Sequence, residues 1–443
     1  MKIKSVFFTF LLLSLPFAKL QSFSGFYVAK NNTKLFNKAS QVVFVRKENK
    51  TVLTMASDYQ GDLKEFAIVI PVPTLITKEQ IHIVDKALLD HLDLYTSPRF
   101  VEYFDSNPCQ KIEPSAKKGT LMKPKTQNNN GRSAARAQSL GVKIEAPSTV
   151  GEYDILILSA KESSGLETWL KEHGYKIPEG ISRILESYLR QNMKFLVAKV
   201  NLKEQSKLGF SFLRPLQIAY ESSQFMLPLR LGTVNASGSQ ELFIYALSSK
   251  GRVESANYRS LKIPTGMDLP LYIKDEFKKF YHSMFSEQIK KEGIKTLFTE
   301  YASDRAGCDS CAANFLSKEE LKNLGVFWLD EMNHPQGGGA VRLNMRSVMP
   351  SSNLNTFITR LHVRYDREHF LEDLVFRETA DRTDFQGRYV LRHPWTGRDS
   401  CPAALDYRKK LSKRLDEEAQ NLAKLTGGNV NEIRQKMISK ILN

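Results

Sequence analysis

The chain has 443 residues, of which 42% are hydrophobic and 25% charged, and its formal net charge is +16. This is an ordinary globular composition, and it excludes collagen-like, coiled-coil and wholly disordered chains. At about 150 residues per domain, the length corresponds to two or three domains, or to one large domain with insertions. A chain of this length can bury a sizeable core without disulfides.

The N-terminus has the pattern of a secretory signal peptide. Residues 1–4 contain two lysines, and residues 5–18 form an apolar run that is too short to span a bilayer as a helix. The triplet Ser-Phe-Ser at 22–24 offers a cleavage site between small residues, and Ala18 offers a second one. We therefore interpret residues 1–24 as a signal peptide and expect export to the periplasm, the cell envelope or the medium, with no transmembrane segment in the mature chain.

Export also bears on the partners that the charge favours. Cleavage after residue 24 removes three lysines, so the mature net charge is +16 − 3 = +13. A basic exported protein is attracted to anionic surfaces such as lipid headgroups and acidic polysaccharides. We expect anionic envelope components as partners and, because no nucleic-acid-binding motif is recognisable, no nucleic acid.

Residues 25–110 are predicted to be rich in strands. The apolar segments 41–45 and 51–55 flank a charged turn, which is typical of a β-hairpin. The continuous apolar run 65–70 predicts a buried strand, and the spacing of apolar residues over 78–93 predicts a helix.

A basic segment follows. Residues 111–143 hold eight lysines or arginines and a single acid, Glu113. Such a composition does not build a core, so residues 111–147 are interpreted as a flexible, basic, solvent-exposed insertion.

The mixed region 148–305 begins with a strand–helix–helix–strand unit over 153–200. Strand patterns dominate residues 209–263, and an amphipathic helix is predicted over 274–292. A further strand is expected at 296–301.

The C-terminal region 306–443 is predicted to contain a helix at 318–323, a strand at 356–365 and two terminal helices separated by Gly427 and Gly428. Strands and helices are mixed without strict β–α alternation. The sequence therefore predicts an α+β (mixed α/β) fold, strand-rich in its N-terminal and middle parts, with one α/β unit and a C-terminal helical pair.

Four cysteines, Cys109, Cys308, Cys311 and Cys401, permit three pairings, among which the sequence does not choose. Our working assignment is Cys308–Cys311 with Cys109–Cys401. The close pair Cys308-Asp-Ser-Cys311 follows a predicted strand and precedes a possible helix start. A helix N-terminus lowers the pKa of a thiol, so this pair is also the candidate catalytic centre of a thiol-disulfide oxidoreductase. The alternative is a structural loop staple.

A second candidate site is the cluster His362, Asp366 and His369, which contains residue types that bind metals or transfer protons. It would suit a metal-dependent hydrolase. The alternative is a polar strand face followed by a helix start, with His362 on the same face as Arg360 and Arg364 and opposite Leu361 and Val363. No cofactor is predicted.

Asp58 and Tyr59 lie between two predicted strands. We expect a tight turn there, closed by Gly61, and the carboxylate and the phenol are also candidate ligand-binding groups.

Several segments of the chain resemble the bacterial domain-of-unknown-function 2330 family, and the likeness spans most of the mature sequence apart from the basic insertion. The segments are 25–30, 34–43, 51–55, 58–62, 65–73, 301–313, 360–365 and 386–395. The resemblance implies an exported bacterial protein and supplies no activity or catalytic residues. With no assembled catalytic motif in the sequence, we expect a non-catalytic binding or structural protein of the periplasm or cell envelope, and a thiol-disulfide oxidoreductase or a metal-dependent hydrolase as alternatives.

Overall fold

The computed structural model describes the greater part of the chain. The described residues are 26–29, 36–60, 66–110, 142–160, 163–175, 177, 181–207, 213–235, 238–304, 315–329 and 355–442. The predicted signal peptide and most of the basic insertion lie outside these ranges. Among the described helices, none combines the length and the apolar character that crossing a bilayer requires.

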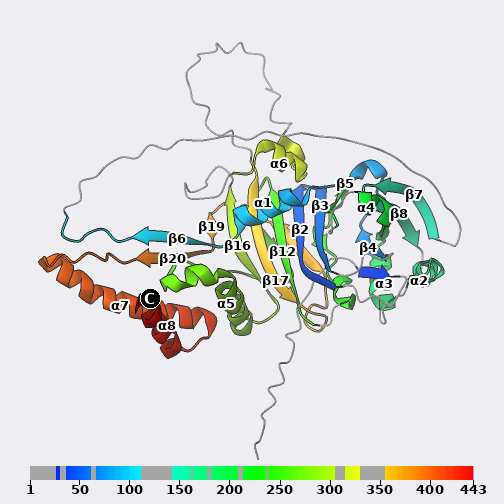
Figure 1. The fold of residues 1–443 in the computed structure, drawn as a ribbon. Helices are drawn as coiled ribbons and strands as arrows, with labels where there is room; N and C mark the ends of the chain where they lie inside the picture. The colour runs from blue at the N-terminus through cyan, green and yellow to red at the C-terminus, as the bar shows by residue number, and fades with distance from the viewer. Residues whose placement is uncertain are drawn as a thin grey trace, which may run out of the picture.

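A large mixed sheet forms the centre of the molecule (Figure 1). Its strands run in the order β14-β16-β17-β12-β2-β3-β10-β5, with β19 beside β16. Their bounds are β2 (Phe36–Lys47), β3 (Lys50–Gln60), β5 (Ile81–Ile83), β10 (Leu216–Glu221), β12 (Gln240–Ser248), β14 (Arg259–Lys262), β16 (Thr296–Asp304), β17 (Phe357–Tyr365) and β19 (Phe385–Gln386). The pairs β2–β12 and β14–β16 are parallel and the other described pairs are antiparallel. The predicted hairpin is confirmed, since Val45 of β2 lies opposite Val52 of β3.

A second, antiparallel sheet of five strands has the order β1-β4-β9-β8-β7. Its strands are β1 (Phe26–Ala29), β4 (Phe66–Val72), β7 (Val142–Val150), β8 (Tyr153–Ala160) and β9 (Lys194–Val200). The predicted strand–helix–helix–strand unit is confirmed, with helices α2 (Ser163–Glu172) and α3 (Ile181–Arg190) between β8 and β9. Because two helices form the connection, β9 returns as the antiparallel neighbour of β8.

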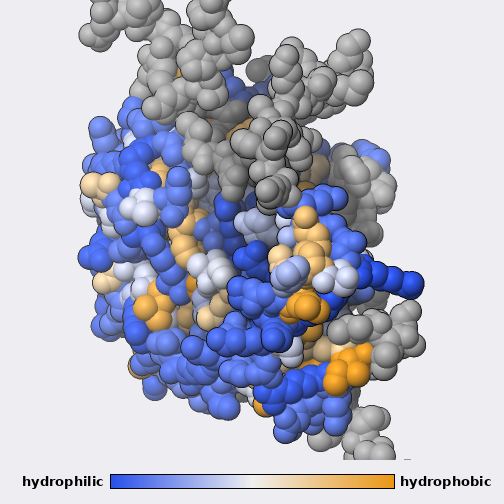
Figure 2. Space-filling model, turned by 90° about the vertical axis from the view of Figure 1, so that its left-hand side faces the viewer, coloured by the Kyte–Doolittle hydropathy of each residue, from blue (hydrophilic) through white to orange (hydrophobic). Residues whose placement is uncertain are grey.

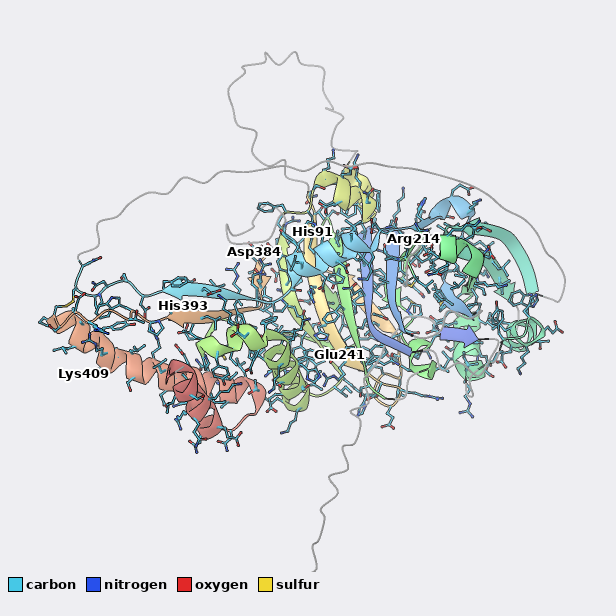
Figure 3. All side chains as sticks on the ribbon, viewed as in Figure 1. His91, Arg214, Glu241, Asp384, His393 and Lys409 are labelled. Atoms are coloured by element: carbon cyan, nitrogen blue, oxygen red, sulfur yellow. A yellow bond between two sulfur atoms is a disulfide. The ribbon has the colours of Figure 1, made fainter. Side chains whose placement is uncertain are left out.

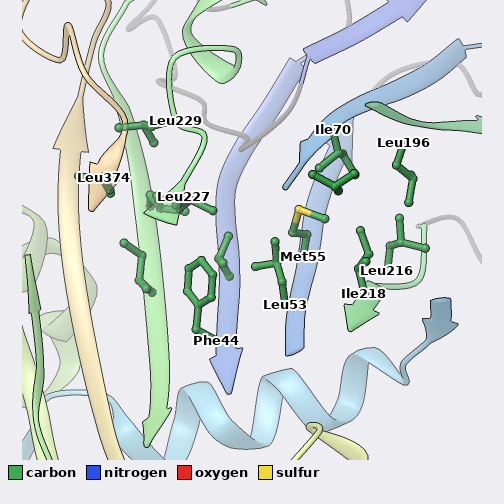
Figure 4. Close-up of a cluster of buried hydrophobic side chains, with 14 of the residues drawn as sticks. Phe44, Leu53, Met55, Ile70, Leu196, Leu216, Ile218, Leu227, Leu229 and Leu374 are labelled. Atoms are coloured by element: carbon green, nitrogen blue, oxygen red, sulfur yellow. The ribbon is translucent and has the colours of Figure 1, made fainter. Parts of the chain in front are cut away.

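The main hydrophobic core lies between these two sheets. Successive side chains of a strand point to opposite faces, so every second residue of each sheet enters this core. Phe44, Leu53 and Met55 from the central sheet meet Ile70 and Leu196 from the five-stranded sheet (Figure 4).

The other face of the central sheet is covered by helices α1 (Lys86–Thr96), α5 (Phe277–Glu292) and α6 (Lys318–Asn323) (Figure 1). The helix predicted over 78–93 is only partly correct, because α1 begins at Lys86 after Asp85, whose side chain accepts a hydrogen bond from the Ala87 amide at 2.9 Å. Ile81 belongs instead to the short edge strand β5, where it pairs with Ile218 and enters the sheet core. Its apolar side chain serves that core rather than a helix face.

The remaining elements are two small sheets, the short helix α4 and the C-terminal helices α7 and α8. Two small sheets have the orders β15-β20-β6 and β11-β18-β13. The bounds are β6 (Arg99–Phe104), β11 (Met226–Leu227), β13 (Val253–Ser255), β15 (Met267–Leu269), β18 (Leu374–Glu378), β20 (Arg388–His393), α4 (Leu202–Lys207), α7 (Pro402–Thr426) and α8 (Val430–Leu442). The terminal helical pair is confirmed, and Gly427 ends α7 with a left-handed φ of 69°. This mixture of helices and sheets confirms the α+β class.

A disulfide joins Cys109, shortly after β6, to Cys401, the residue that precedes α7. The two cysteines are 292 residues apart in sequence. The bond therefore fixes the start of the long C-terminal helix beside the end of β6.

Candidate binding pocket

The structure places the predicted site residues in different parts of the molecule. Cys308 and Cys311 lie outside the described residues, so their pairing and their redox role stay predictions. The backbone of Asp58 and Tyr59 belongs to β3, where Tyr59 pairs with Asn37 of β2. The expected turn is therefore wrong, because β2 begins at Phe36 and extends the hairpin pairing past these residues.

The cluster His362, Asp366 and His369 does not converge. His369 Nδ1 lies 2.8 Å from Asp366 Oδ1, a contact within one turn of chain. His362 faces Glu300 on the neighbouring strand. Over the ranges that the structure describes, no group of three or more histidine, cysteine, aspartate or glutamate side chains is placed to hold a metal ion.

The alternation predicted for 358–365 is present in β17. Leu361 and Val363 enter the core between the sheets, and Arg360 and His362 point to the opposite face. That polar face is itself buried, with exposed fractions of 4% for Arg360 and 1% for His362, because α1 and α5 cover it.

Glu300 of β16 is the centre of this buried face and is completely inaccessible to solvent. Its Oε2 accepts a hydrogen bond from Arg360 Nε at 2.6 Å, and its Oε1 lies 2.7 Å from His362 Nδ1. The Tyr281 hydroxyl of α5 donates to the same Oε1. Burial alone raises the pKa of a carboxyl group, but the charges of Arg360 and His362 outweigh it and lower the pKa of Glu300.

The pKa of His362 responds to the same contacts in the opposite direction. Burial acts to lower it, and the charges of Glu300 and Glu241 together with the hydrogen bond to Glu300 raise it above its usual value. These contacts favour the protonated imidazole.

Glu241 of β12 flanks the other side of the histidine. It accepts a hydrogen bond from Arg364 Nε at 3.1 Å and a second one from Arg364 Nη2. Burial acts to raise the pKa of Glu241, but His362 and Arg364 lower it to about 2. The carboxylate is therefore ionised and engaged by Arg364.

Two aromatic rings hold the imidazole of His362 between them. The ring of Phe285 lies parallel to it at a centroid distance of 3.6 Å, and the ring of Phe243 stacks on it at 4.2 Å. Its Nε2 is buried and has no hydrogen-bond partner, since the carboxylate atom Oε2 of Glu241 is 3.6 Å away. The imidazole is therefore fixed in position by one carboxylate and two aromatic rings.

His362 lines a pocket of about 180 Å³ between α5 and the strands β12 and β17. Figure 3 labels Glu241 beside α5, at this position. The pocket is lined by four aromatic residues and four polar ones: Phe243, Phe277, Tyr281, Phe285, Glu241, Lys278, His282 and His362. Cavities of about 150 Å³ bind benzene. This pocket therefore has room for one six-membered ring and a small substituent.

Sequence reasoning named His362 but missed Glu300, Glu241 and the aromatic residues of the pocket. The available signal was an acidic residue, Glu300, within the predicted strand 296–301. In the structure all residues of β16 except Asp304 are buried. A buried acid needs a partner, and only the pairing of β16 with β17 shows which one.

Together, the fold and the site define an α+β protein with a small aromatic pocket between a mixed sheet and one helix. The chain belongs to the family described as an uncharacterized protein conserved in bacteria (DUF2330), whose family model matches residues 18–377. The resemblance seen in the sequence is thereby confirmed. No curated protein and no solved structure matches the chain.

Proposed function

We propose that this is an exported protein of the bacterial periplasm or cell envelope that binds a small molecule without transforming it. The signal-peptide pattern of residues 1–24 supports export. The Cys109–Cys401 disulfide supports it as well, because disulfides persist in oxidising compartments and are rare in the cytosol.

The small aromatic pocket beside the buried His362 is the observation that carries the binding role. A buried polar atom without a hydrogen-bond partner, such as His362 Nε2, is costly, and its retention in a side chain that lines the pocket supports a function there. The stacked rings of Phe243 and Phe285 fix the imidazole before any ligand arrives, so little ordering cost remains at binding.

Ligand-observed NMR with single-ring probes tests the binding role, with one variant that blocks the pocket. Lys278 lines the pocket and is exposed, so Lys278→Trp fills the mouth without disturbing the core. Lys279 is the matched control, because it is exposed on the same helix and does not line the pocket. We expect Lys278→Trp to abolish the saturation transfer to the probes and Lys279→Trp to preserve it. Equal signals from both variants would refute the pocket as the binding site.

Cell fractionation combined with thiol alkylation tests the export proposal. We expect a processed N-terminus near residue 25 and no free thiol at Cys109 or Cys401. A cytosolic protein that retains Met1 and has both thiols free would overturn the proposal.

The mature charge of +13 supports an anionic envelope component as a further partner. Seen from the side of α7, the surface is mainly hydrophilic with scattered apolar side chains (Figure 2). We expect the mature protein to bind vesicles containing anionic lipid at low salt and to be released at high salt. Equal binding to neutral vesicles would contradict an electrostatic attraction.

A further inference from the structure

We propose that Glu418 makes the packing of helix α7 sensitive to pH: the C-terminal half of the helix packs tightly against β15 and α5 while the Glu418 carboxyl is protonated, and it loosens when the carboxyl ionises. This device is independent of the pocket beside His362. It follows from three properties of Glu418: its burial, its lack of a hydrogen-bond partner and the charges around it.

Glu418 lies on the buried face of α7 and is only 1% exposed. Ala419, Leu422 and Leu425 follow it on the same face and belong to an apolar cluster with Phe280 of α5. An ionised carboxylate at such a position loses its hydration, and this loss is costly unless partners in the protein replace the water.

The nearest cation compensates the carboxylate only in part. Arg414, one turn earlier on α7, holds its Nε 3.5 Å from Glu418 Oε1, which is an ion pair longer than a normal hydrogen bond. Both of these atoms are buried, and neither has a hydrogen-bond partner among the residues that the structure describes. Arg414 directs its Nη2 instead to Asp105 Oδ2, at 2.7 Å. The guanidinium is therefore engaged mainly by Asp105.

The charges on the adjacent strands are engaged with each other as well. Arg392 of β20 donates from its Nε to Asp268 Oδ1 of β15 at 3.0 Å. Burial is the largest influence on Glu418 and raises its pKa. The charges of Asp268 and Asp105 raise it further and those of Arg414 and Arg392 lower it, with the result that the pKa is about 7 instead of 4.5.

The charged groups of α5 and α8 meet other parts of α7. Lys291 of α5 donates to the backbone carbonyl of Lys424 at 2.7 Å, and the carboxylate of Glu287 lies beside Gly427. Arg434 of α8 donates from its Nε to Asp416 Oδ1 at 2.8 Å. None of these contacts involves the Glu418 carboxyl.

The two halves of α7 are fastened differently. The first half is tied down by the Cys109–Cys401 disulfide and by hydrogen bonds from Tyr407 and Arg414 to Asp105. The half after Glu418 contains no cysteine and packs through the apolar cluster. Ionisation of Glu418 therefore acts on the half that depends on close packing, and loosening would expose the apolar face of that half to water.

The direction of the pH dependence follows from the raised pKa. The packed helix binds the proton of Glu418 more tightly than a loosened helix, in which the carboxyl would titrate near its ordinary 4.5. Loosening is therefore unaffected below about pH 4.5, becomes easier as the pH rises from 4.5 to 7, and stays constant above 7.

Hydrogen exchange at several pH values, corrected for intrinsic exchange rates, tests the proposal on the full protein with its disulfide intact. We expect the opening equilibrium of the amides at 419–426 to rise at least about tenfold between pH 5 and pH 7.5, since each unit of pKa shift corresponds to a factor of ten. Helix α3 packs on the five-stranded sheet and is the internal reference, and its amides should show no such rise.

A matched pair of variants assigns the effect to one carboxyl group. Glu418→Gln keeps the shape of the protonated side chain and cannot ionise, so we expect the opening of α7 to become independent of pH. Glu417→Gln is the control, because that side chain is on the same helix and 57% exposed, and it should keep the pH dependence of the unmodified protein. Carbon-13 NMR of the Glu418 carboxyl in the unmodified protein gives a reading that needs no variant, and we expect a titration midpoint near pH 7.

Three results would overturn the proposal: a titration midpoint near 4.5, exchange at 419–426 that does not respond to pH, or an equal response in Glu418→Gln. An equal rise in α3 and α7 would overturn it as well, because Glu418 would then act on the unfolding of the whole protein and not on α7.

Discussion

The two faces of β17 are equally buried and opposite in chemistry. On one face Leu361 and Val363 are completely buried in the core between the sheets. On the other face Arg360 and His362 are 4% and 1% exposed and lie beneath α1 and α5. Apolar packing requires only complementary shape, whereas each charge on the second face requires a partner at a defined position.

This difference separates a face that packs the core from a face that adjoins the proposed binding pocket. Well-packed apolar residues often stabilise a protein as much as a buried ion network or more, because burying charges costs desolvation free energy. The network around Glu300 is therefore a poor device for stability alone. Its histidine, His362, has a buried Nε2 without a hydrogen-bond partner and lines a pocket, which fits the proposed binding site.

Removing the central carboxylate is expected to have the largest effect. Glu300→Ala leaves Arg360 and His362 buried without their shared partner, so we expect it to lower the free energy of unfolding by about 4 kcal/mol. Denaturant unfolding measures this loss. Glu417→Ala is the control, because that side chain is 57% exposed and should change the free energy by less than about 0.5 kcal/mol. A loss below about 1 kcal/mol for Glu300→Ala would show that the network is not coupled in the way the structure indicates.

A cavity on the apolar face is expected to have the next largest effect. Leu361→Ala removes a completely buried side chain from the core between the sheets, and we expect a loss of about 3 kcal/mol. This variant should leave the ¹⁵N shifts of His362 unchanged, because the cavity lies on the other side of the strand. A change in those shifts would mean that the two faces are not independent.

Lowering the pH distinguishes the two faces of β17 further, because only the charged face carries titratable groups. The pKa of Glu241 is lowered to about 2 from an unfolded value of 4.5, so its contribution to stability is complete above pH 4.5 and is lost as the pH falls towards 2. Allowing for its 23% exposed side chain, we expect this contribution to be about 2 kcal/mol. Glu241→Gln should remove this part of the pH dependence of the unfolding free energy. An unchanged acid limb in the variant would contradict the assignment to Glu241.

The apolar face of β17 could be predicted from the sequence, and the partners of its charged face could not. Alternation over 358–365 placed Leu361 and His362 on opposite faces, because the side-chain period of a strand is local information. The helix predicted at 318–323 matches α6, and the structure adds a local signal that supports it, the reciprocal cap formed by Ser317 and Glu320.

The contacts of the charged face depend on long-range pairing. Glu300 meets Arg360 across 60 residues of sequence, and the irregular register between Thr299 and Tyr301 sets which side of β16 the acid occupies. The misassigned helix over 78–93 has a related cause, because apolar spacing alone does not distinguish an edge strand followed by a short helix from one longer helix. Sequence periodicity therefore predicts which side chains share a strand face, and the strand pairing determines which residues that face contacts.

The smallest predicted effect concerns the outer edge of the same network. The Tyr245 hydroxyl donates to Asp93 Oδ1 at 2.5 Å, and Arg360 Nη1 lies 2.8 Å from the same oxygen. Because Asp93 keeps its arginine partner and its side chain is 35% exposed to water, we expect Tyr245→Phe to cost only about 1 kcal/mol of unfolding free energy. A double-mutant cycle with Asp93→Asn isolates this hydrogen bond from the packing of the ring. A loss comparable to that of Glu300→Ala would show that the partly exposed edge of the network contributes as much to stability as its buried centre. This result would contradict the smaller effect expected at the edge.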